Sequence, residues 1–104
     1  MKENEYQSNL KKRILRRFPD SKIIRLNPND NWQGIPDLLV LNNDKWAALE
    51  VKKDKKTFMS ESGKRPNQNY YINQMKEMSY ASFIYPENEE EVLNELSGYF
   101  GEED

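Results

Sequence analysis

The sequence predicts an α/β fold in which a mixed sheet is flanked by helices, with the elements in the order α, β, β, β, α, β, α. Apolar residues recur at helical spacing over residues 3–18. Two runs of β-favouring residues, 38–41 and 46–51, flank a polar turn and predict a hairpin. A helical pattern at 67–78 leads into an apolar strand at 80–85, which is the order of a crossover to a parallel strand. An antiparallel hairpin and a parallel strand together make a mixed sheet.

Composition restricts the chemistry that the chain can perform. Its 104 residues are enough for one domain, 1–104, but leave no room for a separate recognition module. Neither cysteine nor histidine occurs, which excludes disulfides, thiolate nucleophiles and metal sites built from either residue. Carboxylates, lysine and water remain, and hard oxygen ligands favour Mg²⁺, with Mn²⁺ as a substitute.

The net charge of −2 conceals an uneven distribution of charge along the chain. Residues 87–104, the predicted acidic C-terminal helix and tail, contain eight acidic residues and no basic one. Residues 1–86 therefore hold all 16 Lys and Arg against ten acids, a local balance of +6. Basic clusters at 11–25 and 52–65 suit contact with a phosphate backbone. For any single lysine, a solvated helix or loop face is the alternative.

No apolar run approaches the roughly 20 residues needed to span a bilayer, and the N-terminus lacks the apolar core of a signal peptide. The absence of cysteine fits a reducing interior. We therefore expect no membrane partner and a cytoplasmic location.

The first predicted helix, 3–18, carries an apolar stripe and ends at a proline. The stripe consists of Tyr6, Leu10, Ile14 and Phe18. Glu3 lies one turn before this stripe, where an acid is out of place unless it meets positive charge. Glu5 is the alternative acid at this end of the helix. The helix dipole alone also stabilises an acid in a first turn, whatever the function.

A short strand at 22–27 and a polar loop precede the hairpin. Gly34 permits an unusual backbone angle or the close approach of another segment. Pro36 holds its predecessor in the extended region and lacks a donor for the sheet, so the next strand should begin there. This start sets the direction of the Asp37 side chain.

The register of the hairpin brings three charged residues together. A two-residue loop at 43–44 would place Asp37 opposite Glu50, with Lys52 two residues further along the same face. Opposed carboxylates repel each other, and a divalent cation between them would remove the penalty. The same face carries Leu39, Leu41, Trp46 and Ala48. We therefore expect it to be mostly buried, where charges need partners or a metal; the alternative is three solvated charges on an exposed face.

The rest of the chain supplies a loop and two helices. Residues 54–66 are polar, lysine-rich and without periodicity, which predicts a mobile loop over the site. The helix at 67–78 has Gln68 in its first turn and should pack inward through Tyr71, Met75 and either Met78 or Ile72. The last helix, 87–100, carries its apolar face at Val92, Leu93, Leu96 and Tyr99 or Phe100.

The charged residues of the hairpin resemble the motif of the PD-(D/E)XK nuclease superfamily. Pro36-Asp37 matches the first half of that motif, and Glu50-Val51-Lys52 matches the second half after one hairpin. The longer pattern, which adds Gly34 and Gln68, is similar to the virus-type replication-repair nuclease (VRR-NUC) domain and more distantly to Holliday-junction resolvases. The resemblance covers most of the chain, from residue 3 to about residue 85, and implies a restriction-endonuclease-like αβββαβα core.

The resemblance also implies a role for each matched residue. Four would be catalytic: Asp37, Glu50, Lys52 and Gln68. Four groups would bind Mg²⁺, namely Asp37, Glu50, the main-chain carbonyl of Val51, and Glu3 directly or through water. The lysine would stabilise the transition state or orient the water, and the glutamine would hold the attacking water or a phosphate. Gln74 is the alternative to Gln68.

Nucleic-acid contacts are expected around this site. Arg25 and Asn27 resemble an Arg-x-Asn pair of the family. The basic residues that follow the motif would also bind DNA: Lys53, Lys55, Lys56, Lys64 and Arg65. The implied function is a Mg²⁺-dependent endonuclease for DNA, selective for branched structures such as junctions, in phage or bacterial replication, recombination or repair. A non-catalytic nucleic-acid-binding or assembly module is the alternative, and an RNase is a further one.

A homodimer is also expected. One small domain presents one metal site to one strand, and two copies related by a twofold axis would cut two strands at defined positions. The small members of the resembled family are thought to act in this way. The sequence contains more large apolar residues than a small core needs: Trp32, Phe58, Met59, Tyr70 and Phe83.

Overall fold

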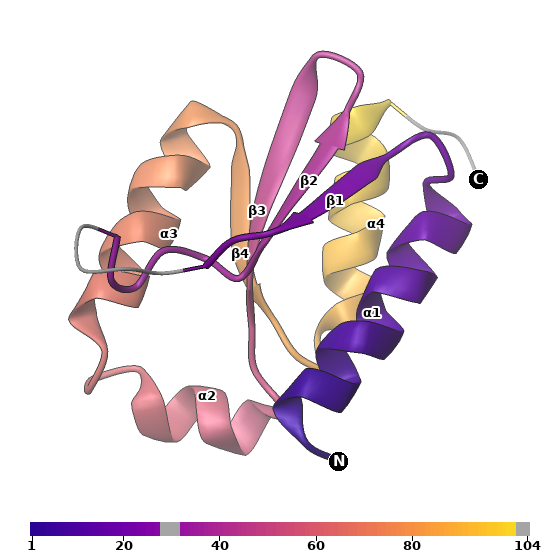
Figure 1. Cartoon of the computed structure of the whole chain (residues 1–104). Coiled ribbons are helices and arrows are strands. Elements are labelled where there is room, and N and C mark those ends of the chain that lie inside the picture. The colour runs from indigo at the N-terminus through magenta and orange to yellow at the C-terminus, as the bar shows by residue number, and fades with distance from the viewer. Residues whose placement is uncertain (28–31, 102–104) are drawn as a thin grey trace.

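In the part of the chain that the structure describes, four strands form one mixed sheet in the order β1-β2-β3-β4, with helices on both faces (Figure 1). The computed structural model describes residues 1–27 and 32–101. The elements are α1 (Glu3–Arg17), β1 (Lys22–Arg25), β2 (Leu38–Asn42), β3 (Lys45–Val51), α2 (Lys55–Glu61), α3 (Pro66–Met78), β4 (Tyr80–Ile84) and α4 (Glu89–Phe100). The predicted α/β class and mixed sheet are confirmed, and α2 is an additional helix. Within the described ranges, no helix has the length and apolar character needed to cross a membrane.

The predicted register of the hairpin is confirmed. β2 and β3 pair antiparallel, with Leu39 opposite Ala48 and Asn42 opposite Lys45. Asn43 adopts a φ of 54° in the turn, a conformation that asparagine tolerates better than most residues. β4 runs parallel to β3. Because β3 is paired on both sides, its C-terminal end places Glu50 in the middle of the sheet.

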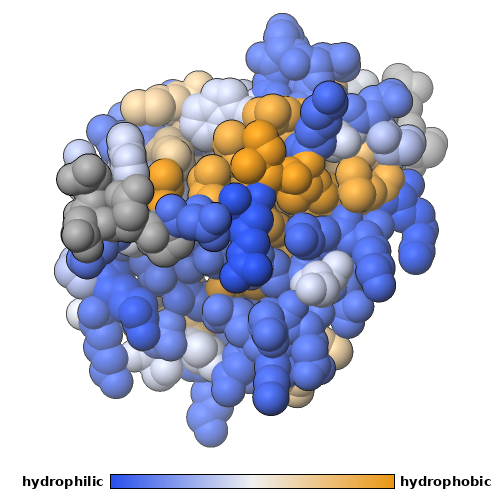
Figure 2. Space-filling view, viewed as in Figure 1, coloured by the Kyte–Doolittle hydropathy of each residue, from blue (hydrophilic) through white to orange (hydrophobic). Residues whose placement is uncertain are grey.

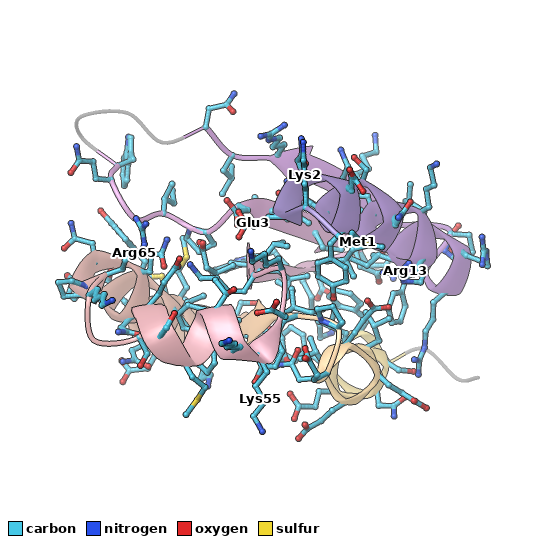
Figure 3. All side chains as sticks on the ribbon, turned by 90° about the horizontal axis from the view of Figure 1, so that it is seen from below. Met1, Lys2, Glu3, Arg13, Lys55 and Arg65 are labelled. Atoms are coloured by element: carbon cyan, nitrogen blue, oxygen red, sulfur yellow. The ribbon has the colours of Figure 1, made fainter. Side chains whose placement is uncertain are left out.

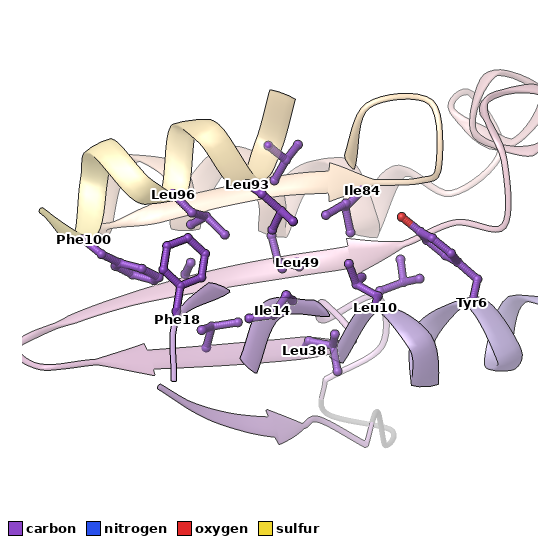
Figure 4. Packing of buried hydrophobic residues seen from close by; sticks show 14 residues of the cluster. Tyr6, Leu10, Ile14, Phe18, Leu38, Leu49, Ile84, Leu93, Leu96 and Phe100 are labelled. Carbon is purple, nitrogen blue, oxygen red and sulfur yellow. The ribbon is translucent and has the colours of Figure 1, made fainter. Parts of the chain in front are cut away.

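The larger hydrophobic core lies between one face of the sheet and the helices α1 and α4 (Figure 4). The predicted stripe of α1 is buried throughout: Tyr6, Leu10, Ile14 and Phe18. The rings of Phe18 and Phe100 meet edge to face with their centroids 5.4 Å apart. This packing holds α1 along the sheet, so that its first turn lies at the end of the molecule where β2 begins.

On the opposite face, α3 packs mainly against β3 and β4. Its Ile72 forms a smaller apolar cluster with Ala48 and Ala81. Met78, the other predicted inward residue, is 65% exposed, so Ile72 is the correct alternative.

The face that carries the charged residues is less buried than predicted. Leu39 and Leu41 are half-buried, and the neighbouring Ile24 is 44% exposed. The reason is that α3 packs mainly over the β3–β4 half of this face, so the β1–β2 half is more exposed. Figure 2 shows the resulting band of apolar side chains over β1 and β2. Burial of the charged residues is therefore a local property of one end of the sheet.

The segment 54–66, predicted to be a mobile loop, contains α2, so that prediction is wrong. The side chain of Asp54 caps the helix by accepting a hydrogen bond of 2.7 Å from the Thr57 N–H. The ring of Phe58 packs against Phe83 and Tyr85, with centroids 4.9 and 5.2 Å apart. Every residue of α2 is at least partly exposed, which leaves no apolar stripe for a periodicity analysis to find.

The large apolar residues expected at a partner surface divide into two groups. Trp32, Met59 and Tyr70 are exposed. Phe58 and Phe83 are half-buried against each other and do not present a free apolar surface. The helix α2 thus uses part of the apolar excess that the sequence suggested for a dimer.

Part of the predicted basic cluster at 11–25 is used inside the molecule. Arg13 donates two hydrogen bonds, of 2.6 and 2.8 Å, to the Glu89 carboxylate at the start of α4. The Tyr6 hydroxyl donates a third to the same carboxylate at 2.8 Å. Arg17 donates to the Asn94 side chain at 2.7 Å. These bonds join the basic helix α1 to the acidic helix α4, which reduces the positive charge that α1 presents to a ligand.

Candidate active site

Asp37 stands immediately before β2, and two backbone contacts hold it there. Its main-chain carbonyl accepts a hydrogen bond of 2.8 Å from the Leu26 N–H, at the end of β1. Its carboxylate oxygen Oδ2 accepts a hydrogen bond of 2.9 Å from the Val51 N–H of β3. Pro36 before it is buried and the carboxylate is half-buried. Asp37 therefore points across the hairpin toward the end of β3, as the register predicts.

Glu50 is only 4% exposed, and its Oε1 has no hydrogen-bond partner among the described residues. Burial, followed by the negative charge of Asp37, raises the pKa of Glu50 to about 9. A buried carboxylate beside a second carboxylate is unfavourable unless a proton or a cation compensates its charge. The arrangement fits a cation to which the unpartnered oxygen would coordinate.

Lys52 contacts oxygen atoms from three elements. Its Nζ lies 2.7 Å from Glu61 Oε1 on α2 and 2.9 Å from Gln68 Oε1 on α3. It also lies 3.8 Å from Glu50 Oε2 on β3. The Lys52 side chain is only 5% exposed. The structure thus brings the predicted glutamine and lysine together beside the carboxylates.

Glu3 faces the same group of charges from the first turn of α1. Partial burial of its carboxyl group, followed by the negative charge of Asp37, raises the pKa of Glu3, although the residue as a whole is exposed. Figure 3 shows Glu3 at the start of α1, and Arg65 at the start of α3, on either side of this end of the sheet. Glu5, the alternative, is exposed on the same turn. Glu3 is therefore the acid that the fold directs toward the site.

An open cleft of about 430 Å³ lies over the two carboxylates. It is lined by Gln33, Gly34, Ile35, Asp37, Glu50, Lys64, Arg65, Pro66, Asn67 and Gln68. The two acids form its more buried part, and the exposed Lys64 and Arg65 form its rim. A cation would therefore meet negative charge inside the cleft, and an anionic ligand would meet positive charge at its rim. Gln74, the alternative to Gln68, is exposed further along α3.

The other predicted DNA-binding residues lie outside the lining of this cleft. They are Arg25, Asn27, Lys53, Lys55 and Lys56, and all five are exposed. Arg25 pairs with Leu38 in the sheet and so lies one residue from the strand position of Asp37. The structure brings two of the seven predicted DNA-binding residues, Lys64 and Arg65, directly to the cleft.

Few side chains of the protein are placed to bind a metal ion here. Within residues 1–27 and 32–101, no group of three or more His, Cys, Asp or Glu side chains is placed to hold an ion. The pair of Asp37 and Glu50, with the unpartnered Oε1, is what fits a hard cation, and main-chain or water oxygens would complete its shell. Val51 contributes its N–H to Asp37, and ligation by its carbonyl stays a prediction.

Comparisons of the chain with protein-family models, with curated protein sequences and with solved structures found no match. The interpretation of the cleft therefore depends on its own geometry and chemistry. The sequence does not predict two residues of the site. Asn67 lines the cleft, and Glu61 contacts Lys52 beside it. Glu61 lies in the segment predicted as a loop, and the sequence signal for its helix is the capping residue Asp54 followed by a helix-compatible stretch.

The close approach predicted for Gly34 occurs against the start of α3. Gly34 has a φ of +87°, and a Cβ added there would lie 2.6 Å from the Asn67 Cβ and 3.0 Å from the Gln68 nitrogen. The change Gly34→Ala is therefore expected to displace the first turn of α3 and to lower the free energy of unfolding by about 1–3 kcal/mol.

Urea unfolding measures this effect, with Gly63→Ala as the matched control. A Cβ added at Gly63 meets nothing within 4 Å. Equal stabilities of the two alanine variants would contradict the proposed contact between Gly34 and α3.

Proposed function

We propose that this protein is a Mg²⁺-dependent endonuclease that hydrolyses phosphodiester bonds of DNA, as its resemblance to PD-(D/E)XK nucleases implies. The observation that supports the proposal most is the buried Glu50, which has one unpartnered oxygen and lines an open cleft together with Asp37. A module that only binds nucleic acid has no need for two adjacent carboxylates, which repel a phosphate backbone. A cation between them would convert the repulsion into attraction.

The resemblance implies a role for each residue, and their positions in the structure support these roles. Asp37 and Glu50 would hold Mg²⁺, and Mn²⁺ would substitute for it. When bound, the ion would supply Lewis acidity and lower the pKa of a coordinated water. Gln68 lines the cleft and would orient the water or a phosphate oxygen. The Lys52 ammonium would balance negative charge that develops on the phosphate oxygens.

The reaction is a hydrolysis without a covalent enzyme intermediate. The oxygen of a water forms a bond to phosphorus while the bond from phosphorus to the leaving 3′ oxygen breaks. The proton of the water passes to solvent, and the leaving oxygen takes up a proton. Lys64 and Arg65 at the rim of the cleft would hold the phosphates on either side of the scissile bond.

Cleavage of a panel of labelled DNA tests the proposal. The panel contains junctions, flaps, duplexes and single strands, with an RNA strand beside them and each substrate incubated with Mg²⁺, Mn²⁺ or EDTA. We expect cuts with either metal, none with EDTA, and a preference for branched DNA. Protein with Asp37→Ala, purified in the same way, controls for contaminating nucleases. Binding of the panel without any metal-dependent cut would favour the binding module, and cuts confined to RNA would favour an RNase.

A further inference from the structure

Lys52 does not line the open cleft, although its Nζ lies 3.8 Å from Glu50 Oε2. It lines instead a crevice between α2 and α3 that is too narrow to hold water, together with Phe58, Glu61 and Phe83 among others. The Lys52 side chain is 5% exposed. Arg65 and Gln68 line both the crevice and the cleft, so the two spaces are neighbours. A phosphate in the cleft could contact Arg65 directly, but Lys52 would already be bound to another group of the protein.

Glu61 is the anion that engages it. One oxygen, Oε1, lies 2.7 Å from Lys52 Nζ and 3.4 Å from Arg65 Nε. The hydrogen bond from Lys52 lowers the pKa of Glu61, so its carboxylate is charged at neutral pH. A single anionic oxygen between two cations is also the contact that a phosphate oxygen makes with a pair of basic side chains. Glu61 therefore occupies the place on Lys52 and Arg65 that a phosphate would take.

The element that carries Glu61 is lightly attached to the rest of the fold. Figure 1 shows α2 lying across the lower end of the sheet, apart from the layers formed by the other helices. Every one of its residues is at least partly exposed. Phe58 holds it through ring contacts, and the Lys55 N–H donates a hydrogen bond of 2.9 Å to Glu87. The Glu61 side chain, 28% exposed, can swing to solvent without disturbing the main core.

We propose that Glu61 is a positioning residue that holds the Lys52 ammonium out of the cleft, and that a phosphate of a bound DNA strand replaces the Glu61 carboxylate on Lys52 and Arg65. The inference rests on the proposed function, because it takes a phosphodiester strand as the ligand. Without Glu61, Lys52 is free to meet the phosphate from the start, and DNA binds more tightly. With Glu61, only a ligand that offers a competing anionic oxygen releases Lys52 from α2.

A double-mutant cycle in EDTA tests the exchange without any cleavage. Fluorescence anisotropy with a labelled oligodeoxynucleotide duplex measures Kd for the wild type, Glu61→Gln, Lys52→Met and the double variant. We expect Glu61→Gln to lower Kd about tenfold in the presence of Lys52 and by no more than about twofold, through Arg65 alone, in the Lys52→Met background. Glu77→Gln, which removes the same charge from an exposed position near the end of α3, should change Kd by less than about twofold.

Three results would overturn the inference: an unchanged Kd for Glu61→Gln, an equal gain in the Lys52→Met background, or an equal gain for Glu77→Gln. The first would mean that Glu61 does not compete with the ligand, and the others that general electrostatics explains the gain. Its failure is distinguishable from that of the proposed function. If the wild type cleaves DNA but Glu61 and Lys52 show no coupling, the proposed function stands and the proposed exchange is wrong. If the two residues are coupled but the protein does not cleave DNA in Mg²⁺, the exchange stands and the proposed nuclease activity is wrong.

Discussion

Replacing Glu50 by glutamine is expected to abolish Mg²⁺-dependent DNA cleavage and, in the same molecule, to raise stability at neutral pH. Glutamine has the shape of the protonated carboxyl group but cannot offer a charged oxygen to a cation. Outer partners of metal ligands already cost 10- to 100-fold when removed, so loss of a direct ligand should lower kcat/KM by about 10²-fold or more. The stability gain follows from electrostatics, because burial and the charge of Asp37 both oppose ionisation of Glu50 when no metal is added.

The size of the stability change depends on pH in a defined window. The pKa of Glu50 rises from 4.5 to about 9 on folding, so the folded chain keeps a proton that the unfolded chain releases between these values. This contribution to the free energy of unfolding is fully present below pH 4.5 and is lost as pH rises toward 9. By pH 7 the loss is about 3 kcal/mol, and Glu50→Gln avoids it.

Urea unfolding of both proteins at pH 5, 7 and 8.5 measures the difference, with Glu77→Gln as the control for general charge. We expect the advantage of Glu50→Gln to grow from pH 5 to pH 8.5. Added Mg²⁺ should stabilise the wild type, because a ligand that binds only the folded state raises the free energy of unfolding, and should leave Glu50→Gln unaffected. Parallel pH profiles for the two proteins would mean that Glu50 is not held neutral by its surroundings. Undiminished cleavage by Glu50→Gln would mean that Glu50 is not a metal ligand.

The sequence could predict those parts of the site that depend on strand register and helix periodicity. The two-residue turn after Asn42 sets the hairpin register, and this register places Asp37 near Glu50. The four-residue apolar spacing of α1 directs Glu3 toward the same end. Both placements follow from the regular repeat of side-chain directions along a strand or a helix, which the amino-acid sequence shows directly.

Other parts of the site depend on contacts between distant segments, and the sequence could not predict them. α2 has no buried stripe, so its seven residues look like a polar loop. The partner of Lys52 is Glu61, which becomes a neighbour only because this helix folds back across the end of the sheet. Likewise, Gly34 could be recognised as an unusual position, but only the packing of α3 shows that it meets Asn67.

Removing the Lys52 side chain as Lys52→Ala is expected to eliminate cleavage while leaving Mg²⁺ binding intact. The ammonium lies 3.8 Å from Glu50 Oε2 and would act on charge that develops only in the transition state. Loss of one such contact costs roughly 10²–10³-fold in kcat. The metal ligands themselves are oxygen atoms that this change leaves in place. Without the lysine charge, a cation is needed more beside Asp37 and Glu50, so Mg²⁺ affinity should not fall.

Calorimetric titration with Mg²⁺ and single-turnover cleavage separate the two properties. Lys76→Ala, which removes an exposed lysine from α3, is the matched control and should cleave like the wild type. If Lys52→Ala loses Mg²⁺ binding along with cleavage, the lysine serves to build the carboxylate pair and has no separate part in the chemical step. If it retains both, the buried ammonium is a structural partner of Glu61 and Gln68 alone, and the charge that stabilises the transition state must come from Arg65 or Lys64 at the rim of the cleft.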